Sequence, residues 1–174
     1  MNSNTILFSR LDSPAGRIYL GEFEGRVCKV SLNDRDGGKF YAWVEKEFPY
    51  VGTVIHGDSS PALAMTAQQL DEYFRGDRRV FSVPLHLVGT DFQRLIWRTL
   101  SQIPYGHTIS YGDLAKRACR PGSARAVGGA CGRNPVPILI PCHRVIGSSG
   151  KMTGFGGGIA LKKKILALEG HIFE

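Results

Sequence analysis

Residues 110–133 read SYGDLAKRACRPGSARAVGGACGR and contain two short helical patterns on either side of a tight turn. Ser110 and Asp113 resemble a capping box in which aspartate takes the usual place of glutamate, so a first helix begins here. Pro121-Gly122 must stop that helix, because proline lacks a backbone donor and glycine favours turns. Ser123 then caps a second helix. Two short helices joined in this way indicate a helix-turn-helix, whose second helix lies in a DNA groove.

The second helix of this pair carries two glycines in its interior. We expect the first helix to run to about Cys119 and the second to about Arg133. Gly128 and Gly129 each destabilise a helix by about 1 kcal/mol relative to alanine. Close crossing of two helices of this protein, or close approach of another backbone, would compensate, and the pattern leaves both open.

Upstream of the pair, the sequence predicts a longer amphipathic helix. Asp91 or Thr90 can cap it, and it ends before Pro104 and Gly106. The side chains on its apolar face are Phe92, Leu95, Ile96, Thr99, Leu100 and Ile103.

The first third of the chain predicts a small antiparallel sheet. Apolar and polar residues alternate in Thr5–Leu11, Arg17–Glu22 and Arg26–Leu32, which is typical of a β-meander. Gly38–Phe48 and Pro61–Arg75 have apolar residues at helical spacing and could cover one face of the sheet.

A break in the pattern around Gly76–Gly89 marks the domain boundary, which we place near residue 86. This segment is a loop that can hold a short strand at Val80–Pro84. The fold class is therefore α/β of the α+β kind. It has a β-rich domain over residues 1–86 and a mainly helical domain over residues 87–174.

Composition and charge narrow the class of protein. The chain has 174 residues, 43% of them hydrophobic and 21% charged, which predicts a globular protein. Its longest apolar stretches, such as Val136–Pro141, are far shorter than the roughly 20 residues that span a bilayer, and the first residues lack a signal-peptide pattern. We expect no membrane partner and a cytoplasmic location. A formal charge of +7 favours a polyanionic partner such as nucleic acid.

A cysteine and a histidine stand side by side in the stretch Ile138-Leu139-Ile140-Pro141-Cys142-His143-Arg144-Val145. We expect Ile138–Ile140 to be a short buried strand, whose end can present a reactive side chain. The thiolate is the reactive form, and a nearby imidazole or arginine lowers the pKa of a cysteine from about 8.5. Neighbours in an extended segment point to opposite sides, so Cys142 and His143 could need a bridging water. The alternative is a buried cysteine beside a surface histidine.

Three motifs occur together: Arg125-Ala126-Val127-Gly128-Gly129-Ala130, Asn134-Pro135-Val136-Pro137 and Ile140-Pro141-Cys142-His143-Arg144-Val145. Together they resemble the O6-alkylguanine-DNA alkyltransferase family. The resemblance covers Phe92 through Gly170 closely and the N-terminal half only in layout. It implies a small β-rich domain packed on a helical domain that holds the helix-turn-helix and the active site.

The resemblance also implies a catalytic set. Cys142 is the alkyl acceptor, and His143 takes its proton through a water. Glu169 orients His143 and stabilises its charge, as in a catalytic triad. Asn134 is a hinge residue that binds backbone, and Tyr111 can supply a proton to the departing guanine.

The implied partner is double-stranded DNA that carries an alkylated guanine and is bound through its minor groove. Chemistry on a base inside a duplex requires that the base be rotated out of the stack. Arg125 then fills the vacated position, while Tyr111 helps to rotate the 3′ phosphate. Further DNA contacts are implied for Ala124, Ala126, Gly128, Gly129 and Arg133.

A pocket for the extruded base is implied as well. Main chain near Cys142 and Val145 reads the guanine edge, Pro137 and Phe155 form apolar walls, and Thr153–Gly156 form a loop over the base. The substrate-binding set is Tyr111, Pro137, Val145, Thr153, Gly154, Phe155 and Gly156. This chain departs from the family at two of these positions, where relatives often have tyrosine (Phe155) or serine (Gly156). A plain glycine-rich linker to the last helix is the alternative for this segment.

We expect no metal and no other cofactor. Some relatives carry zinc in the N-terminal domain, but Cys28, His56 and His86 include no closely spaced ligand pair. Cys119 and Cys131 are expected to be packing residues, and the four cysteines to be reduced.

The function that follows is DNA repair by transfer of an alkyl group from O6 of guanine to Cys142, once per molecule, by a monomer whose binding along DNA could be cooperative. Two other functions remain open: a non-catalytic sensor of alkylated DNA and a transcription regulator that uses the helix-turn-helix. A cysteine hydrolase, which would turn over repeatedly, is a third.

Overall fold

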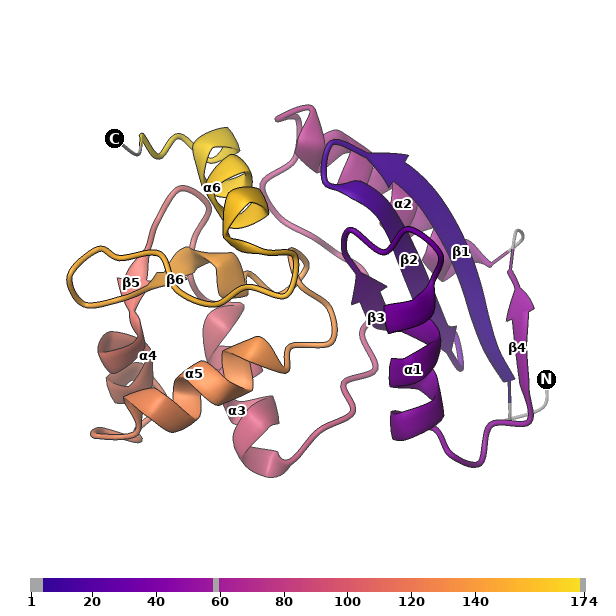
Figure 1. Cartoon of the computed structure of the whole chain (residues 1–174), viewed down its shortest axis with the longest axis horizontal. Helices are drawn as coiled ribbons and strands as arrows, with labels where there is room; N and C mark the ends of the chain where they lie inside the picture. Colours follow the sequence, from indigo (N-terminus) through magenta and orange to yellow (C-terminus); the bar gives the residue numbers. More distant parts are fainter. Residues whose placement is uncertain (1–4, 58–59, 173–174) are drawn as a thin grey trace. The chain divides into compact units, whose positions relative to one another are not determined.

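The structure is a computed structural model that describes residues 5–57 and 60–172. The chain forms two compact units, and the boundary between them in the sequence lies between Val88 and Gly89 (Figure 1). Each unit has its own sheet and its own helices, as Figure 1 labels them.

The N-terminal unit is built on a four-stranded sheet. β1 (Thr5–Ser13), β2 (Gly16–Phe23) and β3 (Arg26–Ser31) pair antiparallel, which confirms the predicted meander. The β2–β3 connection is a two-residue turn in which Glu24 and Gly25 both have positive φ, the geometry that suits the twist of a hairpin.

The sheet has a fourth strand that the sequence pattern does not reveal. β4 (Thr53–His56) pairs parallel with β1, so the order is β3-β2-β1-β4 and the sheet is mixed. The short strand predicted at Val80–Pro84 is wrong, because this segment is irregular and only Leu85 forms a bridge, with Val27.

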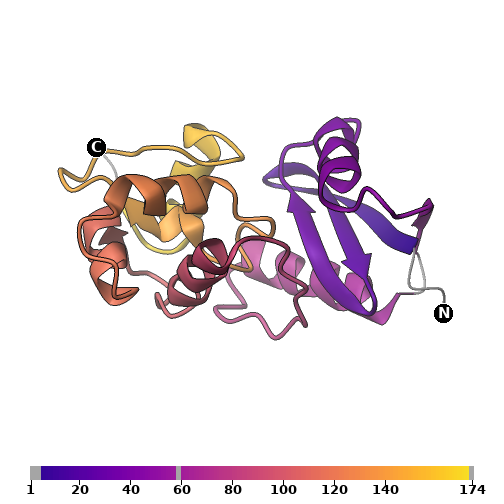
Figure 2. The ribbon, with the colours of Figure 1, turned by 90° about the horizontal axis from the view of Figure 1, so that it is seen from below.

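Two helices cover opposite faces of this sheet (Figure 2). α1 (Gly38–Glu47) packs Phe40 and Val44 against one face, where they form a core cluster with Ile6, Tyr19 and Cys28. α2 (Pro61–Phe74) packs against β1, β2 and β3, and its N-cap Ser60 donates to Glu22 on the other face. Alternate residues of each strand point to opposite faces of a sheet. Because one helix packs on each face, both faces are covered, whereas the sequence pattern predicts both helices on one face.

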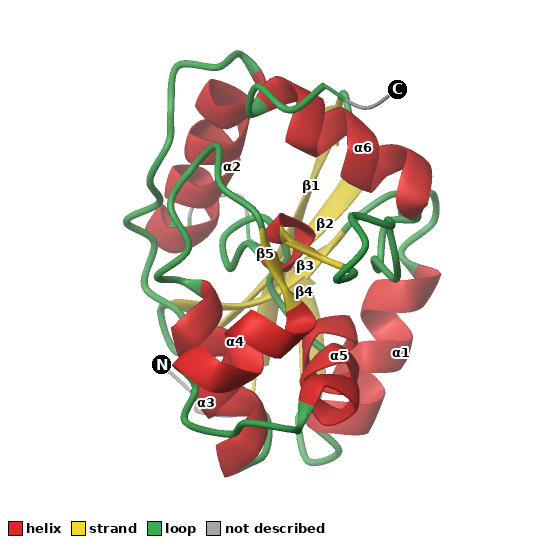
Figure 3. Ribbon diagram, turned by 90° about the vertical axis from the view of Figure 1, so that its left-hand side faces the viewer, coloured by secondary structure: helices red, strands yellow, loops and turns green. Residues whose placement is uncertain are grey.

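The C-terminal unit is mainly helical (Figure 3). α3 (Asp91–Leu100) begins at a full capping box made by Thr90 and Gln93, and α6 (Ile159–Leu168) is the last helix. Two parallel two-residue strands, β5 (Ile109–Ser110) and β6 (Val145–Ile146), join the middle of the unit to the segment after Cys142.

α4 (Tyr111–Arg117) and α5 (Ala124–Gly132) pack against each other across a short turn. The predicted cap at Ser110 is confirmed, since its side chain accepts a hydrogen bond from the Asp113 N–H at 3.0 Å. Ser123 is the N-cap residue of α5, as predicted, but its side chain makes no capping hydrogen bond.

The strand predicted at Ile138–Ile140 is wrong as well. Ile138 has φ of 76°, and the Ile140 N–H donates to the Val136 carbonyl at 3.0 Å, so the segment is a buried turn. Prolines at 135, 137 and 141 remove the donors that a strand ladder needs. The turn leads into a single 3-10 turn, η1 (Cys142–Arg144).

Candidate functional site

Cys142 lies at the start of η1 and is 6% exposed. Burial raises the pKa of its thiol, because a thiolate is poorly solvated there. A hydrogen bond from the Asn134 side chain, the charge of Lys162 and nearby main-chain N–H groups act in the opposite sense. The resting sulfur is therefore a protonated thiol, because burial outweighs the neighbours that lower its pKa, and the net shift is opposite to the one expected from a nearby imidazole or arginine.

Asn134 holds the turn that presents this sulfur. Its amide Nδ2 donates to the Ile140 carbonyl at 2.8 Å, and its Oδ1 accepts from the Val136 N–H at 3.1 Å. Asn134 is itself buried and directly follows Arg133, the C-cap residue of α5. One side chain thus links the end of α5 to the residues before Cys142.

His143, Arg144 and Glu169 form a buried network behind Cys142. The His143 Nε2 lies 2.9 Å from the Glu169 Oε1. Arg144 donates from Nε and Nη2 to the two Glu169 oxygens, at 2.9 Å each, and from Nη1 to the Ile103 carbonyl at 2.6 Å. The Glu169 Oε2 also accepts from the Gly106 N–H at 3.2 Å. Glu169 is therefore held as a carboxylate at the C-cap of α6.

The protonation of His143 follows from this network. Burial lowers the pKa of His143, and the Glu169 carboxylate only partly offsets it. The imidazole is neutral at neutral pH, and with Glu169 as acceptor its proton resides on Nε2. Its Nδ1 is buried and has no hydrogen-bond partner among residues 5–57 and 60–172. That nitrogen can accept a proton from a water or a ligand.

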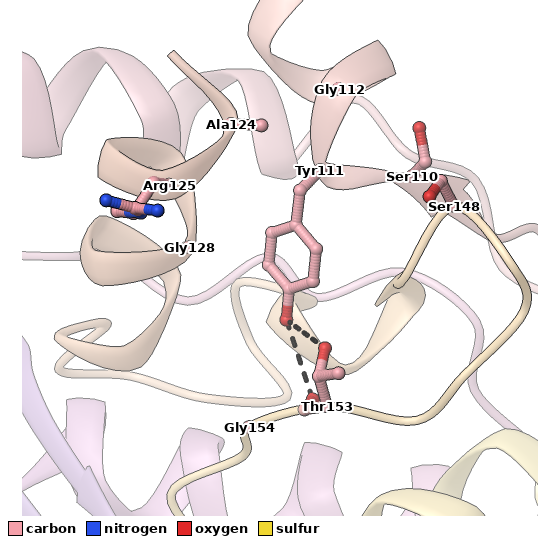
Figure 4. A pocket seen from close by; sticks show the side chains of 9 residues that line it. All are labelled: Ser110, Tyr111, Gly112, Ala124, Arg125, Gly128, Ser148, Thr153 and Gly154. Atoms are coloured by element: carbon pink, nitrogen blue, oxygen red, sulfur yellow. Dashed lines mark hydrogen bonds between the residues drawn. The ribbon is translucent and has the colours of Figure 1, made fainter.

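A pocket of about 620 Å³ lies in the same unit, and Cys142, His143 and Glu169 are not among its lining residues. Its lining residues come from the start of α4, from α5 and from the loop after β6: Ser110, Tyr111, Gly112, Ala124, Arg125, Gly128, Ser148, Thr153 and Gly154. Figure 4 shows the Tyr111 ring pointing toward Thr153, whose hydroxyl donates to the Tyr111 oxygen at 3.3 Å. In the same view Arg125 lies across Tyr111 from Ser148.

Six of the predicted residues line this pocket, and others lie near it. Phe155 is half-buried and meets the His143 ring edge to face, with centroids 6.4 Å apart. Pro137 and Val145 are buried, and Gly156 is exposed on the loop. Ala126 and Arg133 are exposed but do not line the pocket.

The predicted site set omitted five residues of this region. Ser110, which was predicted only as a helix cap, lines the pocket together with Gly112 and Ser148. Arg144, which was predicted only as a neighbour of the cysteine, and Lys162 are buried. Their signal in the sequence was weak, since serines are common in loops and Lys162 stands in a run of three lysines.

Among its described residues, 5–57 and 60–88, the N-terminal unit shows no comparable arrangement. Cys28 is buried in the core against α1, His56 meets the Phe8 ring and His86 meets the Phe23 ring. Within the described ranges, no three His, Cys, Asp or Glu side chains come together as metal ligands. In the same ranges, no helix is long and apolar enough to cross a membrane.

Charge is divided unevenly between the two units. Residues 1–88 contain ten Lys and Arg against eleven Asp and Glu, whereas residues 89–174 contain twelve against four. The formal charge is thus −1 in the first unit and +8 in the second. The unit that holds the pocket is the one suited to a polyanion.

The geometry defines a class of protein: one that holds a buried cysteine, followed in the chain by the histidine of a buried histidine–carboxylate pair, in a basic helical unit. Comparison with known proteins identifies the family. Residues 91–171 match the 6-O-methylguanine DNA methyltransferase, DNA binding domain, and residues 6–87 match the ribonuclease-like domain of the same protein. The chain belongs to the 6-O-methylguanine DNA methyltransferase family.

Individual relatives agree with this assignment. A methylated-DNA–protein-cysteine methyltransferase of Mycolicibacterium paratuberculosis is 54% identical over 165 residues, which cover 94% of this chain and 92% of the relative. A constitutive one of Bacillus subtilis is 39% identical over 150 residues, or 86% of each chain. The crystal structure of Mycobacterium tuberculosis OGT in complex with DNA has a TM-score of 0.78 at 38% identity and covers 95% of this chain and 92% of that one.

Proposed function

We propose that this protein repairs DNA by moving an alkyl group, chiefly methyl, from O6 of guanine to the sulfur of Cys142. The observation that carries the proposal is the buried thiol of Cys142 in a 3-10 turn whose next residue, His143, is bonded to Glu169. A pocket large enough for a base lies in the same unit and is lined in part by helix α5 and by Thr153 and Gly154. Family membership supports the same chemistry.

The transfer is a displacement at the alkyl carbon. A bond forms between carbon and the Cys142 sulfur while the bond to guanine O6 breaks and its electron pair stays on guanine. The thiol proton passes through a water to the Nδ1 of His143, and Glu169 stabilises the imidazolium. Guanine recovers a proton from Tyr111 or a bound water, so the charges balance. Asn134 keeps the acceptor turn in place.

Access to the lesion requires that the base leave the duplex. We propose that α5 docks in the minor groove through Ala124, Ala126, Gly128, Gly129 and Arg133. Arg125 fills the gap left in the stack, and Tyr111 turns the backbone. The extruded base then lies against Pro137, Val145 and the loop residues Thr153, Gly154, Phe155 and Gly156.

The reaction ends with a thioether on Cys142. A sulfur–carbon bond to a simple alkyl group is stable in water, so each molecule reacts once. The chemistry draws on no metal or organic cofactor. We propose that the protein acts as a monomer on chromosomal DNA.

The decisive experiment weighs the intact protein after incubation with duplex DNA that contains O6-methylguanine. A gain of about 14 Da, one methylene, is expected for transfer to the thiol. The Cys142→Ala variant should bind the same duplex without gaining mass.

The alternatives predict different results. A lesion sensor or a transcription regulator binds DNA with no change in mass, and a regulator also prefers one DNA sequence. A cysteine hydrolase releases many product molecules per protein. Any of these outcomes in the wild-type protein would exclude alkyl transfer to Cys142.

A further inference from the structure

α6 contains three lysines in succession, and the structure distinguishes one of them. Lys162 is buried, with none of its surface exposed, whereas Lys163 and Lys164 are exposed. Lys162 lies on the face of α6 that also buries Ile165 and Leu166. A cation on the apolar face of a helix is costly unless its surroundings compensate it.

The ammonium of Lys162 is bound by main chain on two sides of the acceptor site. Its Nζ donates to the Val145 carbonyl at 2.6 Å and to the Thr153 carbonyl at 2.8 Å. Val145 directly follows the Cys142 turn, and Thr153 belongs to the pocket wall. Lys162 therefore joins the acceptor segment to the loop that forms part of the pocket.

The charges around Cys142 do not cancel in the resting protein. Arg144 is neutralised by its two bonds to Glu169, and His143 is neutral because burial lowers its pKa. Both acceptors of Lys162 are uncharged carbonyls.

Two other titratable groups face this cluster and add no charge. Burial raises the pKa of Cys131 on α5 to about 12, and it raises the pKa of Tyr111 on α4 as well. Both are protonated at neutral pH. Within the part of the chain that the structure describes, the cluster therefore holds one positive charge in excess while Cys142 is a thiol. Its net charge is unchanged when the Cys142 proton passes to His143, but it then contains an anion for the Lys162 ammonium to stabilise.

The two groups influence each other directly. Burial raises the pKa of Cys142, and the Lys162 charge acts against it. Burial lowers the pKa of Lys162, and a thiolate at Cys142 acts against that shift. A buried cation without a charged partner stabilises an anion that forms near it. The Lys162 ammonium is therefore suited to a site where a thiolate has to form at Cys142.

We propose that Lys162 is a positioning residue of the acceptor site, which ties the Cys142 segment to the Thr153 loop and supplies the positive charge that stabilises the Cys142 thiolate. This inference rests on the proposed alkyl transfer. Lys162 keeps its proton throughout. The thiol proton leaves toward His143, the sulfur–carbon bond forms, and the electrons of the broken carbon–oxygen bond stay on guanine.

The test measures how fast iodoacetamide, a neutral reagent, alkylates Cys142 at pH 8, with the site located by peptide mass. Lys162→Met removes charge and hydrogen bonds, Lys162→Gln keeps N–H donors without charge, and Lys162→Arg keeps both. Lys163→Met is the matched control, since it removes the same charge one residue away. Circular dichroism establishes that each variant is folded.

We expect Lys162→Met and Lys162→Gln to slow the reaction about tenfold, which corresponds to one unit in the pKa of the thiol. Lys162→Arg should stay within about threefold of the wild type, and Lys163→Met should equal it. If Lys162→Met does not fold, the comparison of Gln with Arg decides alone. A wild-type rate for Lys162→Gln, or an equal loss in Lys163→Met, would overturn the proposal.

The same variants are then reacted with duplex DNA that carries O6-methylguanine. Lys162→Gln should accept methyl more slowly than Lys162→Arg. The iodoacetamide rates report on Lys162 even if the wild-type protein accepts no methyl group from DNA, so failure of the proposed function and failure of this inference give different results.

Discussion

At the scale of single residues, the buried network that follows Cys142 in the chain is built on one carboxylate that accepts hydrogen bonds from several donors. Glu169 accepts from His143, from two nitrogens of Arg144 and from the Gly106 N–H. A guanidinium can make two parallel bonds to a carboxylate, and a lysine ammonium cannot. Arg144 is therefore needed for its shape as well as its charge.

We predict that Arg144→Lys lowers the free energy of unfolding by about 2–4 kcal/mol, because part of a buried ion pair is lost. Urea denaturation at pH 7 measures the change. Arg117→Lys, at an exposed position of α4, makes the same exchange and should leave stability unaltered. Equal stability of the two variants would contradict the role given to Arg144.

A second prediction at this scale concerns pH. Burial lowers the pKa of His143 below its ordinary value of 6.5, so below that pH the unfolded chain binds a proton that the folded protein refuses. The contribution of neutral His143 to the free energy of unfolding is therefore complete above pH 6.5. It is lost as the pH falls below this value, by at most about 1.4 kcal/mol per pH unit for one proton. Urea denaturation between pH 7 and 5 should show a shallower loss in His143→Asn. An unchanged slope would count against a buried neutral imidazole.

At the scale of elements, packing within the protein does not explain why Gly128, in the interior of α5, is a glycine. A Cβ on Gly128 would lie 3.7 Å from the Tyr111 ring, an ordinary contact, whereas a Cβ on Gly129 would lie 3.2 Å from the Arg133 side chain. The fold thus tolerates alanine at Gly128, and the remaining explanation for that glycine is close approach of an outside backbone.

We predict that Gly128→Ala raises the free energy of unfolding by about 0.5–1 kcal/mol, since alanine favours helix, yet weakens binding to duplex DNA. Gly132→Ala is the matched control: it lies at the end of the same helix with open space around it. It should not change DNA affinity. Thermal denaturation and fluorescence anisotropy give the two readouts, and unimpaired binding by Gly128→Ala would remove the argument for backbone approach at α5.

Elements with a clear period or a capping signal could be predicted from the sequence. The meander, α1, α2 and the capped helices α3 and α4 all lie within a few residues of their predicted positions. β4 has only four residues and lacks a distinctive alternation of apolar and polar residues, so it was not predicted from the sequence. The run Ile138–Ile140 is buried throughout, and burial alone does not distinguish a strand from a turn.

The candidate site divides in the same way. Cys142, His143 and Glu169 were predicted through motifs, and the structure brings the last two within hydrogen-bond distance. Lys162 could not be singled out from the sequence, because the two residues that follow it, Lys163 and Lys164, are also lysines. Only the face of α6 that packs inward distinguishes it.

At the scale of the whole molecule, charge assigns different tasks to the two units. The C-terminal unit carries a formal charge of +8 and the N-terminal unit −1, so attraction to a polyanion comes from residues 89–174. Each phosphate contact releases counterions, and the logarithm of the affinity then falls with the logarithm of salt concentration by about 0.9 per contact.

We predict that Arg120→Gln, in the exposed turn between α4 and α5, reduces this salt dependence by about one contact. Arg26→Gln removes the same charge from an exposed position of the N-terminal unit and should leave the slope as it is. Anisotropy with an unmodified duplex, titrated at several salt concentrations, measures both without alkyl transfer. The two variants differ only in the unit that loses a cation. If Arg26→Gln lowered the salt slope as much as Arg120→Gln does, the excess charge of the C-terminal unit would not be what binds the duplex.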